Sequence, residues 1–133
     1  MFLSMMSCTD KKTVIINTFK DFPEEIQGCA CYFSKTKEDL YKGVYVFTDN
    51  NDDLGFIKIN GKMEMLDLTG FDQKDDTHWT KVFTNSEYEI TVVSEQLWQV
   101  DQIWHQKSVL TIKDKKGKLV TESIHVFGEC GGC

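Results

Sequence analysis

The most conspicuous absence from this 133-residue chain is arginine, since all 15 of its cationic side chains are lysines. They face 21 carboxylates, which leaves a formal net charge of −6. Proteins that bind nucleic acid need a basic face, and guanidinium groups are the side chains that best match phosphates and guanine edges. We therefore expect no nucleic-acid partner for a net-negative chain without arginine.

Proline and long apolar runs are scarce as well. The chain has one proline and nine scattered glycines, so nothing in it resembles a flexible linker between domains. No window approaches the roughly 18 consecutive apolar residues that a transmembrane helix needs. A domain of this length can bury roughly two-thirds of its unfolded surface. We expect one domain over 13–133, preceded by a short separate segment at 1–12.

The sequence also lacks the short motifs that carry common catalytic chemistry. It contains no P-loop, no GxSxG or HExxH motif and no paired-carboxylate motif. A run that begins at Asp49 imitates the opening of a calcium loop, but Leu54 stands where glycine is required and Asn60 where a bidentate glutamate belongs. We expect neither an enzyme nor a calcium site.

Strand-forming sequence, by contrast, is abundant. Nine Phe, four Tyr and three Trp favour pleated surfaces. Short strands are predicted at 13–19, 29–34, 44–48, 54–59, 62–68, 79–84, 88–93, 104–113 and 119–127. Parallel strands would need crossover helices, and only 34–43 has the pattern of a short helical turn. The prediction is an all-β fold, an antiparallel meander of about eight strands closed into a small barrel or folded into a sandwich.

Two local features stand out within this strand pattern. Asn60-Gly61 is the strongest hairpin signal, because both residues tolerate the positive φ of a tight turn. The segment 94–103 is ambiguous, with apolar residues at both helical and strand spacing. Trp98 lies within this segment and Trp104 directly follows it. Both are candidate binding residues that could form a stacking platform for a sugar or a peptide. The alternative is that both tryptophans cap the core.

The first residues resemble the end of a bacterial lipoprotein signal. The apolar and small residues 1–7 are followed by Cys8 and then by the polar run 9–12. In this lipobox pattern Ser7 occupies the small position, and the cysteine is the acylated residue. Met5 stands where leucine is usual and no basic segment precedes it, so we expect the true start to lie upstream. The resemblance implies export to the cell envelope and a lipid anchor at Cys8; the alternative is an apolar tail with one free thiol.

Four further cysteines form the only constellation with recognisable chemistry, namely Cys29, Cys31, Cys130 and Cys133. They are compatible with disulfides that tie the first core strand to the last, with a four-thiolate zinc site, or with a redox-active CGGC dithiol. Export favours the disulfides, whereas a cytoplasmic location would favour zinc. The redox interpretation lacks the helix N-terminus that usually lowers the pKa of such a thiol.

The chain shows two family resemblances, the first of which covers most of its length and the second of which is looser. The runs 28–34, 56–61, 110–117 and 128–133 resemble a group of small uncharacterised lipoproteins of Bacteroidetes-type bacteria, and that group brings no known activity. The strand–turn–strand at 44–68, with an early and a late cysteine, is similar to the C-type membrane-bound lysozyme inhibitors.

Those inhibitors are small β-barrel lipoproteins that insert a loop of Ser-Gly-x-x-Tyr type into the lysozyme cleft. The nearest match in this chain is the run Asn85-Ser86-Glu87-Tyr88, which lacks the glycine and has a different spacing. This resemblance adds Asn85, Ser86 and Tyr88 to the candidate binding residues.

The functional expectation is a non-catalytic lipoprotein of the cell envelope that binds an unknown protein or glycan, or serves a structural role. The alternatives are an inhibitor of a cell-wall hydrolase and a metal-binding protein with zinc at the four cysteines. Because one fold hosts many functions, the barrel alone does not choose among them.

Overall fold

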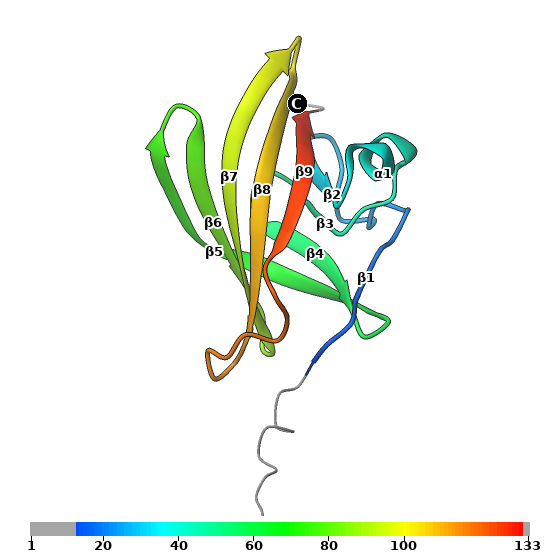
Figure 1. Ribbon diagram of the computed structural model, residues 1–133, viewed down its shortest axis with the longest axis vertical. Helices are drawn as coiled ribbons and strands as arrows, with labels where there is room; N and C mark the ends of the chain where they lie inside the picture. The colour runs from blue at the N-terminus through cyan, green and yellow to red at the C-terminus, as the bar shows by residue number, and fades with distance from the viewer. Residues whose placement is uncertain (1–12, 132–133) are drawn as a thin grey trace, which may run out of the picture.

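The computed structural model describes residues 13–131, so Cys8, Cys133 and the segment 1–12 lie outside the described residues. The described part is built from strands and one short helix, α1 (Lys37–Lys42) (Figure 1). The strands are β1 (Ile16–Asn17), β2 (Ala30–Ser34), β3 (Phe47–Asp49), β4 (Leu54–Ile59), β5 (Lys62–Asp75), β6 (His78–Thr84), β7 (Tyr88–Val100), β8 (Ile103–Asp114) and β9 (Ile124–Gly131).

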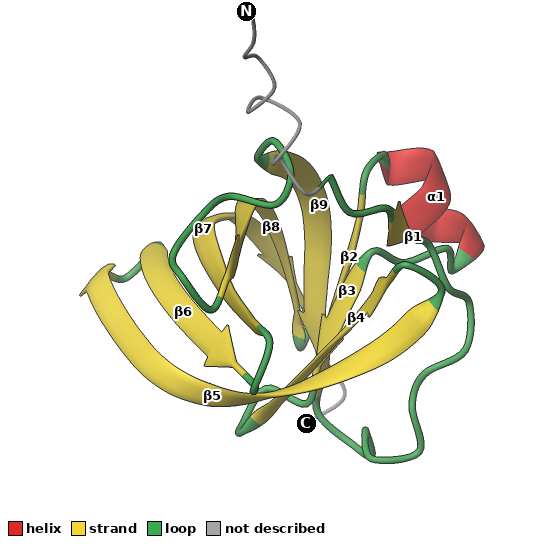
Figure 2. Ribbon diagram, turned by 90° about the horizontal axis from the view of Figure 1, so that it is seen from below, coloured by secondary structure: helices red, strands yellow, loops and turns green. Residues whose placement is uncertain are grey.

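Strands β2 to β9 follow one another around a closed barrel. Each strand pairs antiparallel with the next one along the chain, and β9 pairs with β2 to complete the ring. The extra strand β1 pairs with the end of β4, where Ile16 lies opposite Ile59. Figure 2 shows α1 outside this ring of strands. The predicted antiparallel meander is confirmed, and it is a barrel rather than a sandwich.

The predicted turn residues fall where the backbone needs them. Asn60 and Gly61 have φ of 51° and 80°, which is the left-handed region that a tight hairpin between β4 and β5 demands. Helix α1 begins after Thr36, whose hydroxyl accepts a hydrogen bond from the Asp39 amide at 3.0 Å. It ends at Gly43, with φ of 76°.

Several strand boundaries differ from the sequence prediction. β5 and β7 continue well past the predicted ends at 68 and 93, because β5 pairs with β6 from Asp67 to Asp75 and β7 pairs with β8 from Tyr88 to Val100. The ambiguous segment 94–103 is therefore mostly strand, with a turn at Asp101, whose φ is 56°. The first predicted strand shrinks to two residues, and β9 begins at Ile124 rather than at 119.

The barrel interior is packed with aromatic and aliphatic side chains. Phe33, Phe47 and Phe83 are almost fully buried within it. Two glycines make room for these rings. A Cβ at Gly55 would lie 2.7 Å from Phe47 Cζ, and one at Gly128 would overlap the ring of Phe33. An eight-stranded barrel is just wide enough for side chains to fill, and here aromatic rings fill much of it.

Candidate functional site

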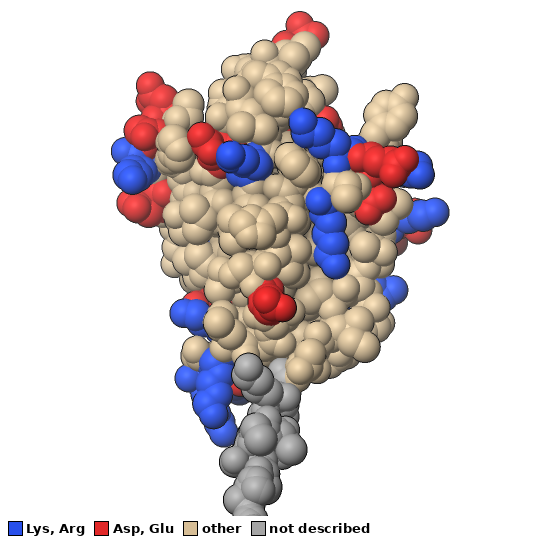
Figure 3. Space-filling model, viewed as in Figure 1, with Lys and Arg blue, Asp and Glu red and all other residues tan. Residues whose placement is uncertain are grey.

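A groove lies on the outside of the barrel, between α1 and the neighbouring faces of β7, β8 and β9. Its volume is about 470 Å³. In Figure 1, α1 stands beside the sheet near the end of β9, and Figure 3 shows that the surface over these strands is largely uncharged. The side chains that matter for its chemistry are Tyr32, Lys37, Trp98, His105, Phe127 and Glu129.

Four of these side chains form one row across four strands. In the sheet register Tyr32 on β2 lies opposite Glu129 on β9. Glu129 lies opposite His105 on β8, and His105 opposite Trp98 on β7. Directly opposite residues in antiparallel strands project from the same face of the sheet. The row Tyr32–Glu129–His105–Trp98 therefore crosses the floor of the groove; we call it the outer row.

A β-bulge brings Trp98 into the outer row. Gln96 pairs with Gln106, but the next paired residue on β7 is Trp98, which pairs with His105, so Leu97 is an extra residue. Without that extra residue, the strand alternation would place Leu97 opposite His105. The bulge thus turns the indole to the outside, where 46% of Trp98 is exposed.

The carboxylate of Glu129 is the centre of the hydrogen bonding in the groove. The Tyr32 hydroxyl donates to Glu129 Oε1 at 3.1 Å, and His105 Nδ1 lies 3.3 Å from Oε2. The imidazole of His105 stacks on the Trp98 indole, with ring centroids 4.8 Å apart and planes 18° from parallel. Each carboxylate oxygen thus has a partner within the protein.

Burial and the carboxylate of Glu129 raise the pKa of two tyrosines in the groove. Burial, followed by the charge of Glu129 and its hydrogen bond, raises the pKa of Tyr32 to about 12. Burial and then the charge of Glu129 also raise the pKa of Tyr45. Both phenols are therefore neutral at physiological pH, and the Tyr32 hydroxyl is the donor to Glu129.

One cation already occupies the groove. Lys37 is the first residue of α1, and its Nζ lies 5.9 Å from the centre of the Trp98 ring and 5.3 Å from the centre of the Phe127 ring. An ammonium group within about 6 Å of an aromatic face is attracted by the ring quadrupole. Lys37 is therefore held over two rings by its charge.

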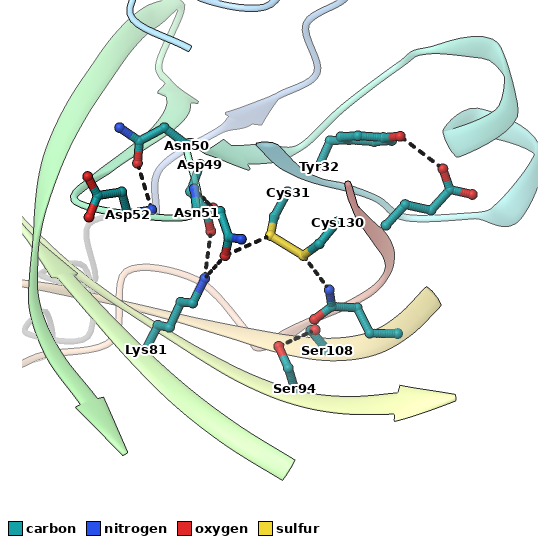
Figure 4. The surroundings of a disulfide bond; sticks show 12 residues. Cys31, Tyr32, Asp49, Asn50, Asn51, Asp52, Lys81, Ser94, Ser108 and Cys130 are labelled. Atoms are coloured by element: carbon teal, nitrogen blue, oxygen red, sulfur yellow. Dashed lines mark hydrogen bonds and ion pairs between the residues drawn. A yellow bond between two sulfur atoms is a disulfide. The ribbon is translucent and has the colours of Figure 1, made fainter. Parts of the chain in front are cut away.

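Directly behind the outer row, a disulfide joins β2 to β9. Cys31 and Cys130 are opposite residues in the register and are bonded to each other. They flank Tyr32 and Glu129 in sequence, so strand alternation points the sulfurs inward while those two side chains point outward, as Figure 4 shows for Tyr32. The expected disulfide tie between the first core strand and the last is confirmed for this pair.

The other cysteines are described only in part. Cys29 is also disulfide-bonded. Because Cys130 bonds to Cys31, it does not form a disulfide within the CGGC motif. Within 13–131, no group of three or more His, Cys, Asp or Glu side chains could hold a metal ion.

The interior beside the disulfide is polar (Figure 4). Gln106 Nε2 donates to Cys130 Sγ at 2.7 Å, and Asn51 Oδ1 lies 3.6 Å from Cys31 Sγ. Further along, Lys81 Nζ lies 3.6 Å from the carboxylate of Asp49. Burial raises the pKa of Asp49, although Lys81 opposes that effect. This cluster gives the packed barrel one buried ion pair near the disulfide.

The structure separates the binding residues that the sequence suggested. Asn85, Ser86 and Tyr88 lie at the turn between β6 and β7, where Asn85 Nδ2 donates to Glu64 at 3.0 Å. Trp98 lies ten residues further along β7, which corresponds to about 33 Å of extended strand. The turn and the tryptophan therefore do not form one site.

The two tryptophans lie in different environments. Trp98 faces the groove, whereas Trp104 is half-buried and packs against the barrel core. The suggested shared platform is not formed, and the core interpretation describes Trp104 alone. Sequence reasoning missed Tyr32, Lys37, His105 and Glu129, because only the strand register and α1 bring them to Trp98.

Comparisons of the chain with models of protein families, with curated proteins and with solved structures found no match. Within the described residues, no helix is long and apolar enough to span a membrane.

Proposed function

We propose that this chain is a non-catalytic binding module of the cell envelope, held to the membrane through acylated Cys8, and that the groove is its ligand site. The observation that carries the proposal is the outer row, in which a carboxylate, a phenol, an imidazole and an exposed indole converge in one groove. Binding sites typically combine aromatic walls with a few convergent polar groups of perturbed pKa.

The hydrogen bonding supports binding rather than catalysis. Both oxygens of Glu129 are engaged by Tyr32 and His105, so the carboxylate is oriented within the protein rather than aimed at a reacting group. A general base must reach the proton that it removes, and a nucleophile needs an activating base beside it.

A nuclear magnetic resonance titration tests the groove as the binding site. Amide and indole signals would be followed while a basic peptide, an acidic peptide or a neutral oligosaccharide is added. We expect at least one of these probes to shift signals of the outer row, and Trp98→Ala to remove that response. Val93→Ala is the matched control, because Val93 is an exposed side chain on the same strand. Shifts confined to other surfaces, or none with any probe, would refute the groove as the site.

The anchor needs its own experiment. Expression of the full chain in a bacterium with labelled fatty acid should label the protein, and Cys8→Ala should abolish the label. An unlabelled wild-type chain would argue against the lipoprotein assignment without affecting the groove.

A second candidate is inhibition of a cell-wall hydrolase. It is favoured by the closed antiparallel barrel with a disulfide between an early and a late cysteine, which agrees with the resemblance to lysozyme inhibitors. The inhibitory segment would then be the turn at Asn85, Ser86 and Tyr88 rather than the groove. An assay of lysozyme activity with this protein in excess tests the function. Inhibition by the wild type that Tyr88→Ala removes would support it, and lysozyme activity unchanged by the wild type would exclude it.

The metal-binding alternative rests on the four cysteines. A zinc site needs thiolates, and Cys31 and Cys130 would have to be released from their disulfide before they could serve. Intact mass under non-reducing conditions, measured beside elemental analysis, decides between the two chemistries. Bound zinc with all thiols reduced would favour the metal, and a mass lower by two hydrogens per bridge without zinc would favour the disulfides.

A further inference from the structure

We propose that the ligand of the groove is a cationic group, an ammonium or guanidinium carried by a basic peptide segment of a partner protein, and that this group displaces Lys37 from the rings of Trp98 and Phe127. The inference rests on the proposed function, since it takes the groove to be the ligand site.

The position of Lys37 shows what chemistry the groove accommodates. Its Nζ lies 5.9 Å from the Trp98 ring centre and 5.3 Å from the Phe127 ring centre. Lys37 is exposed, and no hydrogen bond or ion pair of its ammonium group is found within the described residues. A flexible exposed side chain that is held by ring faces alone can be displaced by an external cation at modest cost.

The charge of the groove favours the same ligand. Glu129 is the carboxylate of the outer row, and its field reaches both Tyr32 and Tyr45. When Lys37 leaves, this carboxylate and the rings of Trp98 and Phe127 still line the same groove, and ammonium groups are recognised by such a combination. The net charge of −6 adds long-range attraction for a basic partner.

The size of the groove fits a side chain rather than an isolated ion. About 470 Å³ is far more than one ammonium group fills. Leu40 and Leu97 contribute apolar lining, and Leu97 is 37% exposed. The aliphatic stem of a lysine or arginine covers such surface while its charged end stays near polar groups.

A neutral sugar fits these observations less well. The Trp98 ring is already stacked against His105 on one side and has Lys37 over it. Glu129 Oε1 accepts a hydrogen bond from the Tyr32 hydroxyl and Oε2 lies 3.3 Å from His105 Nδ1, so both oxygens already have a partner within the protein and offer little to sugar hydroxyls. A neutral ligand would also gain nothing from the negative field.

Isothermal titration calorimetry with a defined peptide pair tests the inference. The probe is an acetylated tri-lysine peptide, and its matched control is the same peptide with each ε-amine acetylated, which removes the charges and keeps the length. We expect binding of the charged peptide, weakened by salt, and at least tenfold weaker binding of the neutral one.

The decisive comparison uses two lysines of the same helix. Lys37→Ala should tighten binding of tri-lysine about fivefold. The peptide ammonium would no longer have to displace the Lys37 ammonium from the two rings, and the free energy of that cation–π contact would appear as a gain in affinity. Lys42→Ala removes the same charge from α1, but Lys42 pairs with Glu38 at 3.6 Å and is not found over either ring. It should change the affinity less than twofold.

Two further variants weaken the site. Glu129→Gln and Trp98→Ala should each reduce the affinity about fivefold, and Trp98→Phe should restore part of it because a ring remains. Equal effects of Lys37→Ala and Lys42→Ala, or equal binding of the charged and neutral peptides, would overturn the inference. An uncharged chito-oligosaccharide that binds in the groove while tri-lysine does not would also overturn it, yet would leave the groove as the ligand site. If neither probe binds and neither shifts the outer row, the proposed function falls as well.

Discussion

Replacement of Glu129 by glutamine tests the electrostatics of the outer row directly. The substitution keeps the shape and an oxygen that accepts from the Tyr32 hydroxyl, but it removes the negative charge. We expect the pKa of Tyr32 to fall from about 12 and to stay above its ordinary value of 10.0, because burial, the largest cause of the shift, remains. The pKa of Tyr45 should fall as well, since Glu129 contributes to its shift. Titration followed by the ring-carbon resonances of each tyrosine measures these changes.

The same coupling has a consequence for stability. Because the pKa of Tyr32 is higher in the folded protein than in the unfolded chain, the folded state holds that proton more tightly. The resulting stabilisation is complete below pH 10.0 and is lost as the pH rises toward about 12. Two pKa units correspond to about 2.7 kcal/mol, and solvent screening of this half-buried group reduces the expected loss to about 1 kcal/mol. Urea unfolding at both ends of this window should show the loss in wild type and a smaller one in Tyr32→Phe.

Two other tyrosines are internal controls for this titration. Tyr41 is 94% exposed, so its ring signals show whether the substitution disturbs the surface of the protein in general. The pKa of Tyr88 is raised by burial and then by Glu87 and Glu64, none of which changes in Glu129→Gln. A pKa of Tyr32 that stays at about 12 in Glu129→Gln would refute the coupling on which the outer row and its proposed ligand depend.

Two packing predictions follow from the barrel interior. Gly128→Ala should lower the free energy of unfolding by about 1–3 kcal/mol, because the new methyl group overlaps the Phe33 ring. Gly70→Ala is the control, since its Cβ would meet Val82 at 3.4 Å, and it should lower the free energy of unfolding less. Urea titration measures both. Lys81→Met should cost about 3 kcal/mol, because it leaves the buried carboxylate of Asp49 without its cation. The double variant with Asp49→Asn should recover part of that loss, and an additive result would contradict the pairing.

The fold could be predicted from the sequence because its signals are local. Alternation in 62–68 places Met65 and Leu66 on opposite faces of the strand, and the structure has them 50% and 1% exposed. The turn at Asn60-Gly61 depends only on the backbone freedom of two residues. The lengths of β5 and β7 could not be predicted, because their outer halves are polar or exposed and depend on pairing with the neighbouring strand.

The candidate site could not be predicted in the same way, because its signals are not local. Tyr32 and Glu129 are 97 positions apart, and they meet only through the register of β2 with β9. Trp98 reaches His105 through a bulge, and one extra residue in a strand leaves little trace in the alternation of a polar segment. The disulfide was foreseeable as a tie between the first core strand and the last, but four cysteines allow three connectivities, and the register selects Cys31 with Cys130.

The disulfide and the groove depend on each other through that register. Cys31 and Cys130 face the interior, and Tyr32 and Glu129 are their immediate neighbours on the outside of the same two strands. A crosslink between opposite residues prevents β2 from sliding along β9, and a slip of one residue would turn Tyr32 away from the groove. The interior bridge therefore holds the phenol and the carboxylate within 3.1 Å of each other on the exterior. This explains how two short strands at the closure of the barrel, one of them only five residues long, can give the proposed binding surface a defined geometry.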